Sequence, residues 1–241
     1  MKFLSLVFFV VVSLVFGSGR AQAEGESVSD PFERFNRASF WFNERLDRNI
    51  LEPVAKEYRA YVPRTVRDSV GNFFENLGYP IYLAGDLIQL KFDQVGLHSG
   101  RFMINSVFGC AGLFDVASEY GMEHHSEDIG TGLGYYGVGE GPYLVLPLLG
   151  PSNLRDTFGR VGQYFISPTT YISEVVSPDS SATATAWSLR AVDVVDGRAG
   201  LLEATDLGKT SSVDYYLFVR TAYHETRQGI IYDGFPPDDD K

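Results

Sequence analysis

Apolar residues recur at helical spacing along most of the chain. In residues 32–46, apolar or small side chains follow one another at intervals of three or four positions, which places them on one face of a helix. Phe40 and Trp41 lie off that face, so this helix is aromatic on more than one side. Similar spacing predicts further helices over residues 64–77, 81–90, 94–107, 153–161, 182–205 and 215–228.

Turn-forming and capping residues predict where several helices begin and end. Asp30, Pro31 and Glu33 form a helix-start pattern, with Asp30 as the N-cap, Pro31 at the first helical position and Glu33 completing a capping box. Pro53 either ends the first helix or restarts it as a second one that reaches Tyr61. We expect a break at residues 62–63, a turn at 78–80, close backbone packing or a tight bend over 109–117, and a cap at 214.

Residues 130–151 have a different character, with seven glycines, three prolines and a charge-free run at 144–149. Gly132, Gly134 and Gly137 match the spacing of a dinucleotide-binding loop. However, Pro142 and other helix-breaking residues follow too soon for the helix that this motif requires. We therefore predict a Gly/Pro-rich loop in the middle of the chain and no nucleotide site.

The N-terminus is predicted to be a secretory signal peptide over residues 1–23. Lys2 is followed by a 14-residue apolar run with only two serines, and then by Ala-Gln-Ala at 21–23, which is a signal-peptidase cleavage pattern. Fourteen helical residues span about 21 Å, which is short of a hydrocarbon core of roughly 30 Å. Residues 24–234 are then predicted to form one helical domain, and residues 235–241 a disordered acidic tail.

The charge balance restricts the partners that the chain can bind. It has 241 residues, with 20 Lys and Arg against 31 Asp and Glu, and a formal net charge of −11. This excess of negative charge argues against a nucleic-acid partner, because phosphate binding needs a surplus of Lys and Arg. The single cysteine excludes an intramolecular disulfide and a zinc site made of four cysteines.

No group of residues indicates catalysis, and we predict no catalytic residue, no metal site and no cofactor. Residues 123–128 offer five side chains that could bind a metal. Neighbouring histidines diverge too far to share one ion, so we expect a solvated polar turn there. The chain lacks a Gly-x-Ser-x-Gly motif, and Cys110, with its small apolar neighbours, is predicted to be a packed side chain. The apolar surplus indicates either a large core or a surface or channel that contacts lipid acyl chains.

Four blocks of the chain, at its start (residues 30–53), in its middle (101–117 and 132–156) and near its end (214–223), resemble the MlaA (VacJ) family of outer-membrane phospholipid-transport proteins. The most specific block is Gly-Leu-Gly-Tyr-Tyr-Gly-Val-Gly-Glu-Gly-Pro-Tyr at residues 132–143. The other matching residues are 30–37, 42–43, 47, 53, 101–102, 105–106, 109, 114–117, 144–147, 150–152, 154–156, 214–216, 220 and 222–223.

This resemblance implies an all-α, ring-shaped single domain with a central amphipathic channel, lying at the periplasmic face of the Gram-negative outer membrane. The family removes mislocalised phospholipids from the outer leaflet and passes them to a periplasmic lipid carrier, which maintains lipid asymmetry. Trimeric porins are its usual outer-membrane partners, and it performs no chemistry on the lipid. A lipid tail that enters water loses about 0.8 kcal/mol per exposed CH₂, so such a path must shelter the tails.

The sequence departs from the family in its anchor. Family members commonly carry a lipidated Cys at the signal cleavage site, whereas no Cys precedes Cys110 here. Either an apolar girdle holds the ring in the membrane, or the signal stays attached as an anchor. The cleavage pattern favours the girdle.

Two sets of residues are candidates for contact with lipid. Aromatic and aliphatic residues of the central block are expected to line or gate the lipid path, or else to be ordinary core: Tyr135, Tyr136, Val138, Tyr143, Leu144, Leu146 and Leu148. Aromatic residues of the first helix are expected to form the membrane girdle: Phe35, Phe40, Trp41 and Phe42. Arg155 and Asp156 are expected to be a structural ion pair or cap. Two alternatives stay open, a soluble periplasmic lipid-binding module and a lipid hydrolase.

Overall fold

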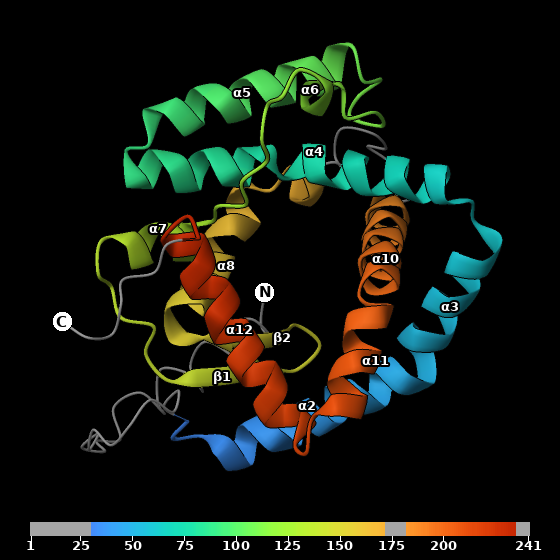
Figure 1. Cartoon of the computed structure of the whole chain (residues 1–241), viewed down its shortest axis with the longest axis vertical. Coiled ribbons are helices and arrows are strands. Elements are labelled where there is room, and N and C mark those ends of the chain that lie inside the picture. Colours follow the sequence, from blue (N-terminus) through green and yellow to red (C-terminus); the bar gives the residue numbers. More distant parts are fainter. Residues whose placement is uncertain (1–29, 172–181, 235–241) are drawn as a thin grey trace.

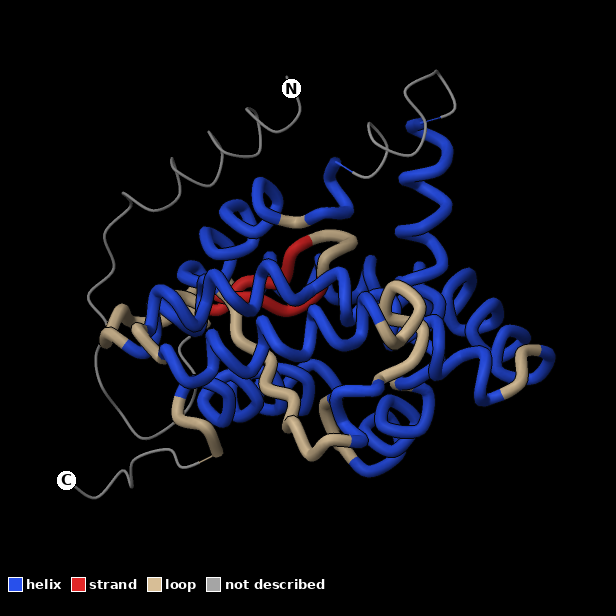
Figure 2. Tube along the Cα trace, turned by 90° about the horizontal axis from the view of Figure 1, so that it is seen from above, coloured by secondary structure: helices blue, strands red, loops and turns tan. Residues whose placement is uncertain are grey.

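The computed structural model describes residues 30–171 and 182–234, so the predicted signal peptide and acidic tail lie outside the described residues. Helices form most of this part of the chain and are arranged as a ring (Figure 1). Within the described residues, strands are confined to one short hairpin (Figure 2). The all-α prediction is therefore confirmed, with this hairpin as an addition.

The first side of the ring is one nearly continuous helical path. It consists of α2 (Glu33–Leu46), a π-helical turn η1 (Asp47–Leu51) and α3 (Glu52–Tyr61). Pro53 restarts the helix, because its missing N–H is tolerated in a first helical turn. The predicted cap at Asp30 is wrong: α2 begins at Glu33, and the Asp30 carboxylate instead accepts hydrogen bonds from distant side chains.

The longest helix, α4 (Arg64–Gln89), runs straight through the turn predicted at residues 78–80. Pro80 removes one backbone hydrogen bond, which normally breaks a helix. Here α4 packs along its length against α5 (Phe92–Val107) and α7 (Ile129–Tyr135). The Tyr79 ring is buried against His98 and Phe102 of α5. This packing keeps the helix intact despite the helix-breaking tendency of Pro80.

The tight bend after α5 is confirmed, but the expected burial of Cys110 is wrong. Cys110, Ala111 and Gly112 all have positive φ angles, and the chain then enters the short helix α6 (Val116–Glu119). The reversal of the backbone turns the Cys110 side chain outward, so it is exposed.

The Gly/Pro-rich segment is more ordered than the predicted loop. Residues 129–135 form α7, and β1 (Tyr143–Leu146) pairs antiparallel with β2 (Gly150–Asn153). Helix α7 tolerates glycine because its neighbours come very close. A Cβ on Gly130 would lie 2.5 Å from Asp156, and a Cβ on Gly134 would lie 2.7 Å from Arg155. Close packing, and not a ligand loop, explains these glycines.

The C-terminal half closes the ring. Helix α8 (Leu154–Ile166) follows the hairpin, and α10 (Ala182–Gly200) and α11 (Leu202–Ser211) replace the single helix predicted over 182–205. Helix α12 (Tyr215–Ile231) is capped by Asp214, as predicted. In Figure 1, α4, α8, α10, α11, α12 and α2 lie around the centre of the ring.

The buried apolar core is divided into small clusters. One joins α3 to α10 and α11 through Ala55, Ala199 and Leu202, and another joins the hairpin to α12. Large apolar side chains are exposed on most helices, among them Trp41 of α2 and Met103 of α5. Apolar exposure on this scale marks a surface that meets a partner or a lipid. No helix within residues 30–171 and 182–234 is long and apolar enough to cross a membrane.

Candidate functional site

The β1–β2 hairpin extends toward the centre of the ring (Figure 1). Its register pairs Tyr143 with Asn153 at the base and Leu146 with Gly150 near the turn. Leu148 and Gly150 have positive φ angles, which lets the chain reverse over residues 147–149. The side chains of Leu148 and Leu149 are 70% and 65% exposed. The hairpin therefore presents two leucines at its tip.

Two asparagines of α2 hold the free edge of β1. Asn36 donates to the Tyr143 carbonyl at 2.8 Å and accepts from the Val145 amide at 2.8 Å. Asn43 makes the same pair of bonds nearer the tip, donating to the Leu146 carbonyl at 2.9 Å and accepting from the Leu148 amide at 2.8 Å. Their spacing of seven residues places both amides on one face of the helix. The side chains act in place of a third strand.

Arg160 of α8 holds the other side of the hairpin. Its guanidinium donates to the Leu149 carbonyl at 3.1 Å and to the Pro151 carbonyl at 3.0 Å. Both turn-flanking segments are thus tied to helices, one to α2 and one to α8. Nothing in the local sequence around Asn36, Asn43 or Arg160 signals this role, because each partner lies in a distant segment or is a backbone group.

The base of the hairpin is anchored by buried polar groups. Tyr143 is 2% exposed and packs against Tyr216 and Tyr223 of α12. Burial raises the pKa of the Tyr143 phenol, as it does that of Tyr216, whose hydroxyl also donates to Asp30. These phenols stay neutral at physiological pH. Tyr143 acts by packing, because its hydroxyl has no hydrogen-bond partner among the described residues, whereas Tyr216 also donates a hydrogen bond. Tyr143 is a core residue, one of the two alternatives that the sequence left open.

A second buried network joins α7, α8 and α12. Arg227 forms ion pairs with Asp128 at 2.7 Å and Asp156 at 2.7 Å, and the Tyr223 hydroxyl donates to Asp156 at 2.5 Å. Arg155 and Asp156 pair at 3.1 Å and are almost fully buried. The expected structural role of Arg155 and Asp156 is confirmed. The network fixes the helices that support the hairpin.

The other candidate path residues fall into two groups. Leu144 and Leu146 lie on β1, on the face opposite Tyr143, and are half-buried. Tyr135, Tyr136 and Val138 are exposed, and the segment from α7 to β1 that contains two of them runs along the outer edge of the ring (Figure 1). The structure thus does not bring these three residues to the hairpin tip.

The aromatic residues of α2 also divide. Phe35, Trp41 and Phe42 are exposed, at 53%, 59% and 46%. Phe40 points inward, with its ring 5.5 Å from that of Tyr216. The three exposed rings are available for contact outside the protein, whereas Phe40 belongs to the cluster under the hairpin.

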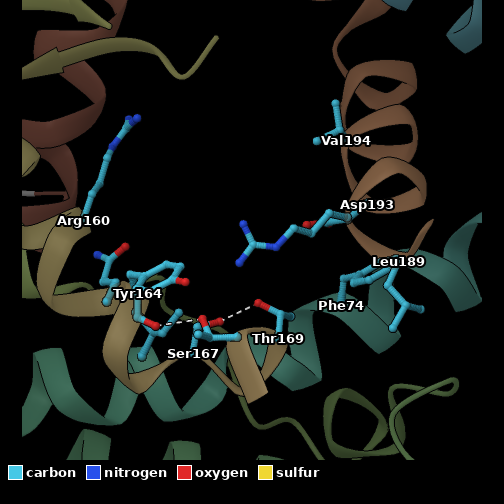
Figure 3. A pocket seen from close by; sticks show the side chains of 12 residues that line it. Phe74, Arg160, Tyr164, Ser167, Thr169, Leu189, Asp193 and Val194 are labelled. Atoms are coloured by element: carbon cyan, nitrogen blue, oxygen red, sulfur yellow. Dashed lines mark hydrogen bonds between the residues drawn. The ribbon is translucent and has the colours of Figure 1, made fainter. Parts of the chain in front are cut away.

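A cavity of about 320 Å³ lies within the ring, between α4, α8 and α10. Figure 3 shows Arg160 on one side, Asp193 and Val194 on the facing helix, and Tyr164, Ser167 and Thr169 between them. Its lining combines charged, hydroxyl and apolar groups. The sequence analysis missed this cavity because its walls come from three segments that are far apart in the chain.

The polar stretch at residues 123–128 is structural, and the expected solvated turn is wrong at its C-terminal end. Glu127 is 1% exposed and accepts hydrogen bonds from Gln89 at 2.6 Å and Thr131 at 2.8 Å. Burial raises the pKa of its carboxyl group. Asp128 caps α7. In the part of the chain that the structure describes, no cluster of three His, Cys, Asp or Glu side chains is arranged to hold a metal ion.

Comparison with known proteins gives a uniform result. A family model described as MlaA lipoprotein matches residues 28–229. A protein of Escherichia coli (strain K12), the intermembrane phospholipid transport system lipoprotein MlaA, is 33% identical over 226 residues, which is 92% of this chain and 86% of that protein. An uncharacterised protein of Rickettsia typhi (strain ATCC VR-144 / Wilmington) is 34% identical over 217 residues, covering 90% and 83% of the two chains.

A solved structure supports the same conclusion. It was reported as "Structural basis for maintenance of bacterial outer membrane lipid asymmetry", and it aligns with a TM-score of 0.71 at 34% identity. The alignment covers 84% of this chain and 99% of that one. The helical ring and the family predicted from the sequence are both confirmed. The chain belongs to the MlaA lipoprotein family.

Proposed function

We propose that this protein moves phospholipids between the outer membrane and a periplasmic carrier, as part of an intermembrane phospholipid transport system. It takes mislocalised phospholipids from the outer leaflet through the ring and thereby maintains lipid asymmetry. It performs no chemistry on the lipid. Family membership and the name of the Escherichia coli relative support the pathway.

One observation carries the proposal furthest: the hairpin tip is apolar, exposed and rigidly supported. Leu148 and Leu149 are exposed at the end of a hairpin whose sides are tied to α2 and α8. An exposed pair of leucines in water is unfavourable by about 25 cal/mol per Å² of apolar surface. Two acyl chains of a lipid in the ring would cover this surface. Leu146 lies next to the tip on β1 and extends the same apolar path.

The exposed rings on α2 support a position at the membrane interface. Phe35, Trp41 and Phe42 are amphipathic or apolar side chains of the kind that gather where hydrocarbon meets headgroups. In the proposal they form the girdle that holds the ring at the periplasmic face of the outer membrane, next to a trimeric porin. Phospholipid, the membrane, the porin and the periplasmic carrier are the proposed partners.

The experiment is to replace Leu148 with Asp and measure lipid transport. In cells that lack their own copy of the protein, the wild-type chain should lower the outer-leaflet phospholipid level, and L148D should fail to do so. Because Leu148 is exposed, the variant should keep the helicity and melting temperature of the wild type. The matched control is Val213→Asp, which replaces a fully exposed apolar side chain away from the hairpin. Equal transport by L148D and wild type would refute the role of the tip.

The soluble periplasmic module is a second candidate function that makes a different prediction. The membrane-ring proposal requires the mature protein to sediment with outer membranes and to carry diacyl phospholipid when it is extracted in mild detergent. A chain recovered only from the periplasmic fraction would favour the soluble module. Native mass spectrometry of the extracted protein also shows whether residues 1–23 have been removed.

A further inference from the structure

The cavity between α4, α8 and α10 contains two oppositely charged side chains on one helix face. Arg190 and Asp193 of α10 both line it. Their spacing of three residues places the two side chains next to each other on the helix surface. Within residues 30–171 and 182–234, neither side chain makes a hydrogen bond or an ion pair, and both are exposed to the cavity side of the helix.

The second arginine of the cavity has other partners. Arg160 donates to two carbonyls of the hairpin. Its guanidinium therefore adds positive charge to the cavity, but it has fewer N–H groups left to donate to a ligand. Arg190 has all of its donors available for a ligand. A guanidinium with free donors suits a phosphate group, which it can bind through two parallel hydrogen bonds.

Asp193 makes the site different from a simple anion site. Partial desolvation at the cavity wall and the nearby Asp196 raise the pKa of the Asp193 carboxyl group, and Arg190 opposes that shift. A bound ammonium group would stabilise the charged carboxylate at this position. In phosphoethanolamine, the phosphate and the ammonium are joined by two carbons, so a single small headgroup can reach both side chains.

The remaining walls match the rest of a phospholipid. Ser167 and Thr169 share a hydrogen bond at 2.8 Å and leave one hydroxyl proton for a ligand oxygen. Phe74, Leu189 and Val194 add apolar surface beside Asp193 (Figure 3). A volume of about 320 Å³ is at the lower end for small-molecule sites, so it suits a headgroup and not a complete lipid.

We propose that this cavity binds the zwitterionic headgroup of a phosphoethanolamine lipid, with Arg190 holding the phosphate and Asp193 the ammonium. This inference rests on the proposed function, which it deepens by naming the headgroup. It gives the ring a preference for an amine-bearing phospholipid over a purely anionic one.

The test compares two lipids with identical acyl chains, dioleoyl phosphatidylethanolamine and dioleoyl phosphatidylglycerol. Native mass spectrometry of the purified full chain in detergent measures the ratio in which they bind. Wild type should prefer phosphatidylethanolamine about tenfold, the effect of one charge-assisted hydrogen bond. Asp193→Asn should abolish the preference for phosphatidylethanolamine. Arg190→Gln should lower the affinity for both lipids about tenfold. Arg64→Gln and Asp68→Asn, in an exposed pair at the start of α4, are the matched controls.

The outcomes separate the two proposals. If wild type binds no phospholipid, the proposed function itself fails. If wild type binds both lipids equally, or if D193N keeps the preference, the headgroup inference is overturned while lipid transport stands. Free phosphoethanolamine should not displace the lipid at equal concentration. Equal affinity for the free compound would identify a soluble amino phosphate as the ligand and would also overturn the inference.

Discussion

Asn36 shows how one side chain can join three parts of this protein. It is fully buried, bonds to both the carbonyl of Tyr143 and the amide of Val145, and donates to the Asp30 carboxylate at 2.7 Å. A buried polar group that loses its partner costs about 1–3 kcal/mol. The base of the hairpin edge, at Tyr143 and Val145, therefore depends on one amide, whereas Asn43 holds the part nearer the tip.

We expect Asn36→Ala to lower the free energy of unfolding by about 3 kcal/mol, because it leaves two buried backbone groups unpaired. Chemical denaturation followed by circular dichroism measures the change. Asn49→Ala is the control, since the Asn49 amide is exposed and bonds only to the Arg45 carbonyl of its own helix. The control should change stability by less than about 0.5 kcal/mol. Equal effects of the two variants would refute the role of Asn36.

Asp214 links the stability of the ring to pH. A hydrogen bond from Arg37 at 2.8 Å, together with those from the first amides of α12, holds the pKa of its carboxyl group below the ordinary value of 3.8. Because the folded state resists protonation, the contribution is present above pH 4 and is lost as the pH falls through the lowered pKa.

We therefore expect the stability of wild type to fall more steeply than that of Asp214→Asn as the pH drops below 4. The amide can still cap the helix, but it cannot titrate. Thermal melting at a series of pH values tests this, with Asp68→Asn as a control for removal of an exposed carboxylate. Parallel pH profiles for wild type and D214N would contradict the linkage.

Among the elements, α4 and α7 approach each other through a glycine. A Cβ on Gly85 would lie 2.9 Å from the backbone nitrogen of Asp128, the residue that caps α7. Backbone cannot move aside as a flexible side chain can. This close contact also explains why α4 continues beyond Pro80, because the second half of α4 is held against α7.

We expect Gly85→Ala to destabilise the protein by about 1–3 kcal/mol, because α4 and α7 must separate. Gly96→Ala in α5 should instead stabilise it by about 0.5–1 kcal/mol, since alanine favours helix and a Cβ there meets no atom within 4 Å. Urea midpoints of the two variants give the comparison. If G85A is as stable as wild type, α4 and α7 can separate at little cost, and the prediction is wrong.

At the scale of the whole molecule, sequence periodicity predicts the helices but not all of their boundaries. The turn predicted at Pro80 does not form because α4 is held by packing against α5 and α7. Asp30 does not cap α2 because its carboxylate accepts a hydrogen bond from α12. The family motif predicted the ring. The cavity and the asparagine supports of the hairpin could not be found from sequence, since they depend on segments that meet only in the folded chain.

The ring is held together by separate contacts between neighbouring elements, and not by one central core. We call each such contact a seam, and we predict that one seam can open while the others stay closed. Between α3 and α10, Ala55 and Ala199 are buried against each other and Leu202, and Arg198 pairs with Asp47 at 2.6 Å. Ala55 is 0% exposed, so a larger side chain there must push α10 away. Overpacking of this kind costs about 1–3 kcal/mol.

We expect Ala55→Leu to open this seam while leaving the opposite side of the ring intact. Hydrogen exchange should speed up in residues 52–61 and 182–200 but not in 92–107, because α5 packs on the far side of α4 (Figure 1). Ala191→Leu, at an exposed position of α10, should leave exchange unchanged. If A55L loses protection equally everywhere, the ring unfolds as one cooperative unit. A local loss would instead show that the opening can widen at one seam, which is how a rigid helical ring could admit a lipid without unfolding.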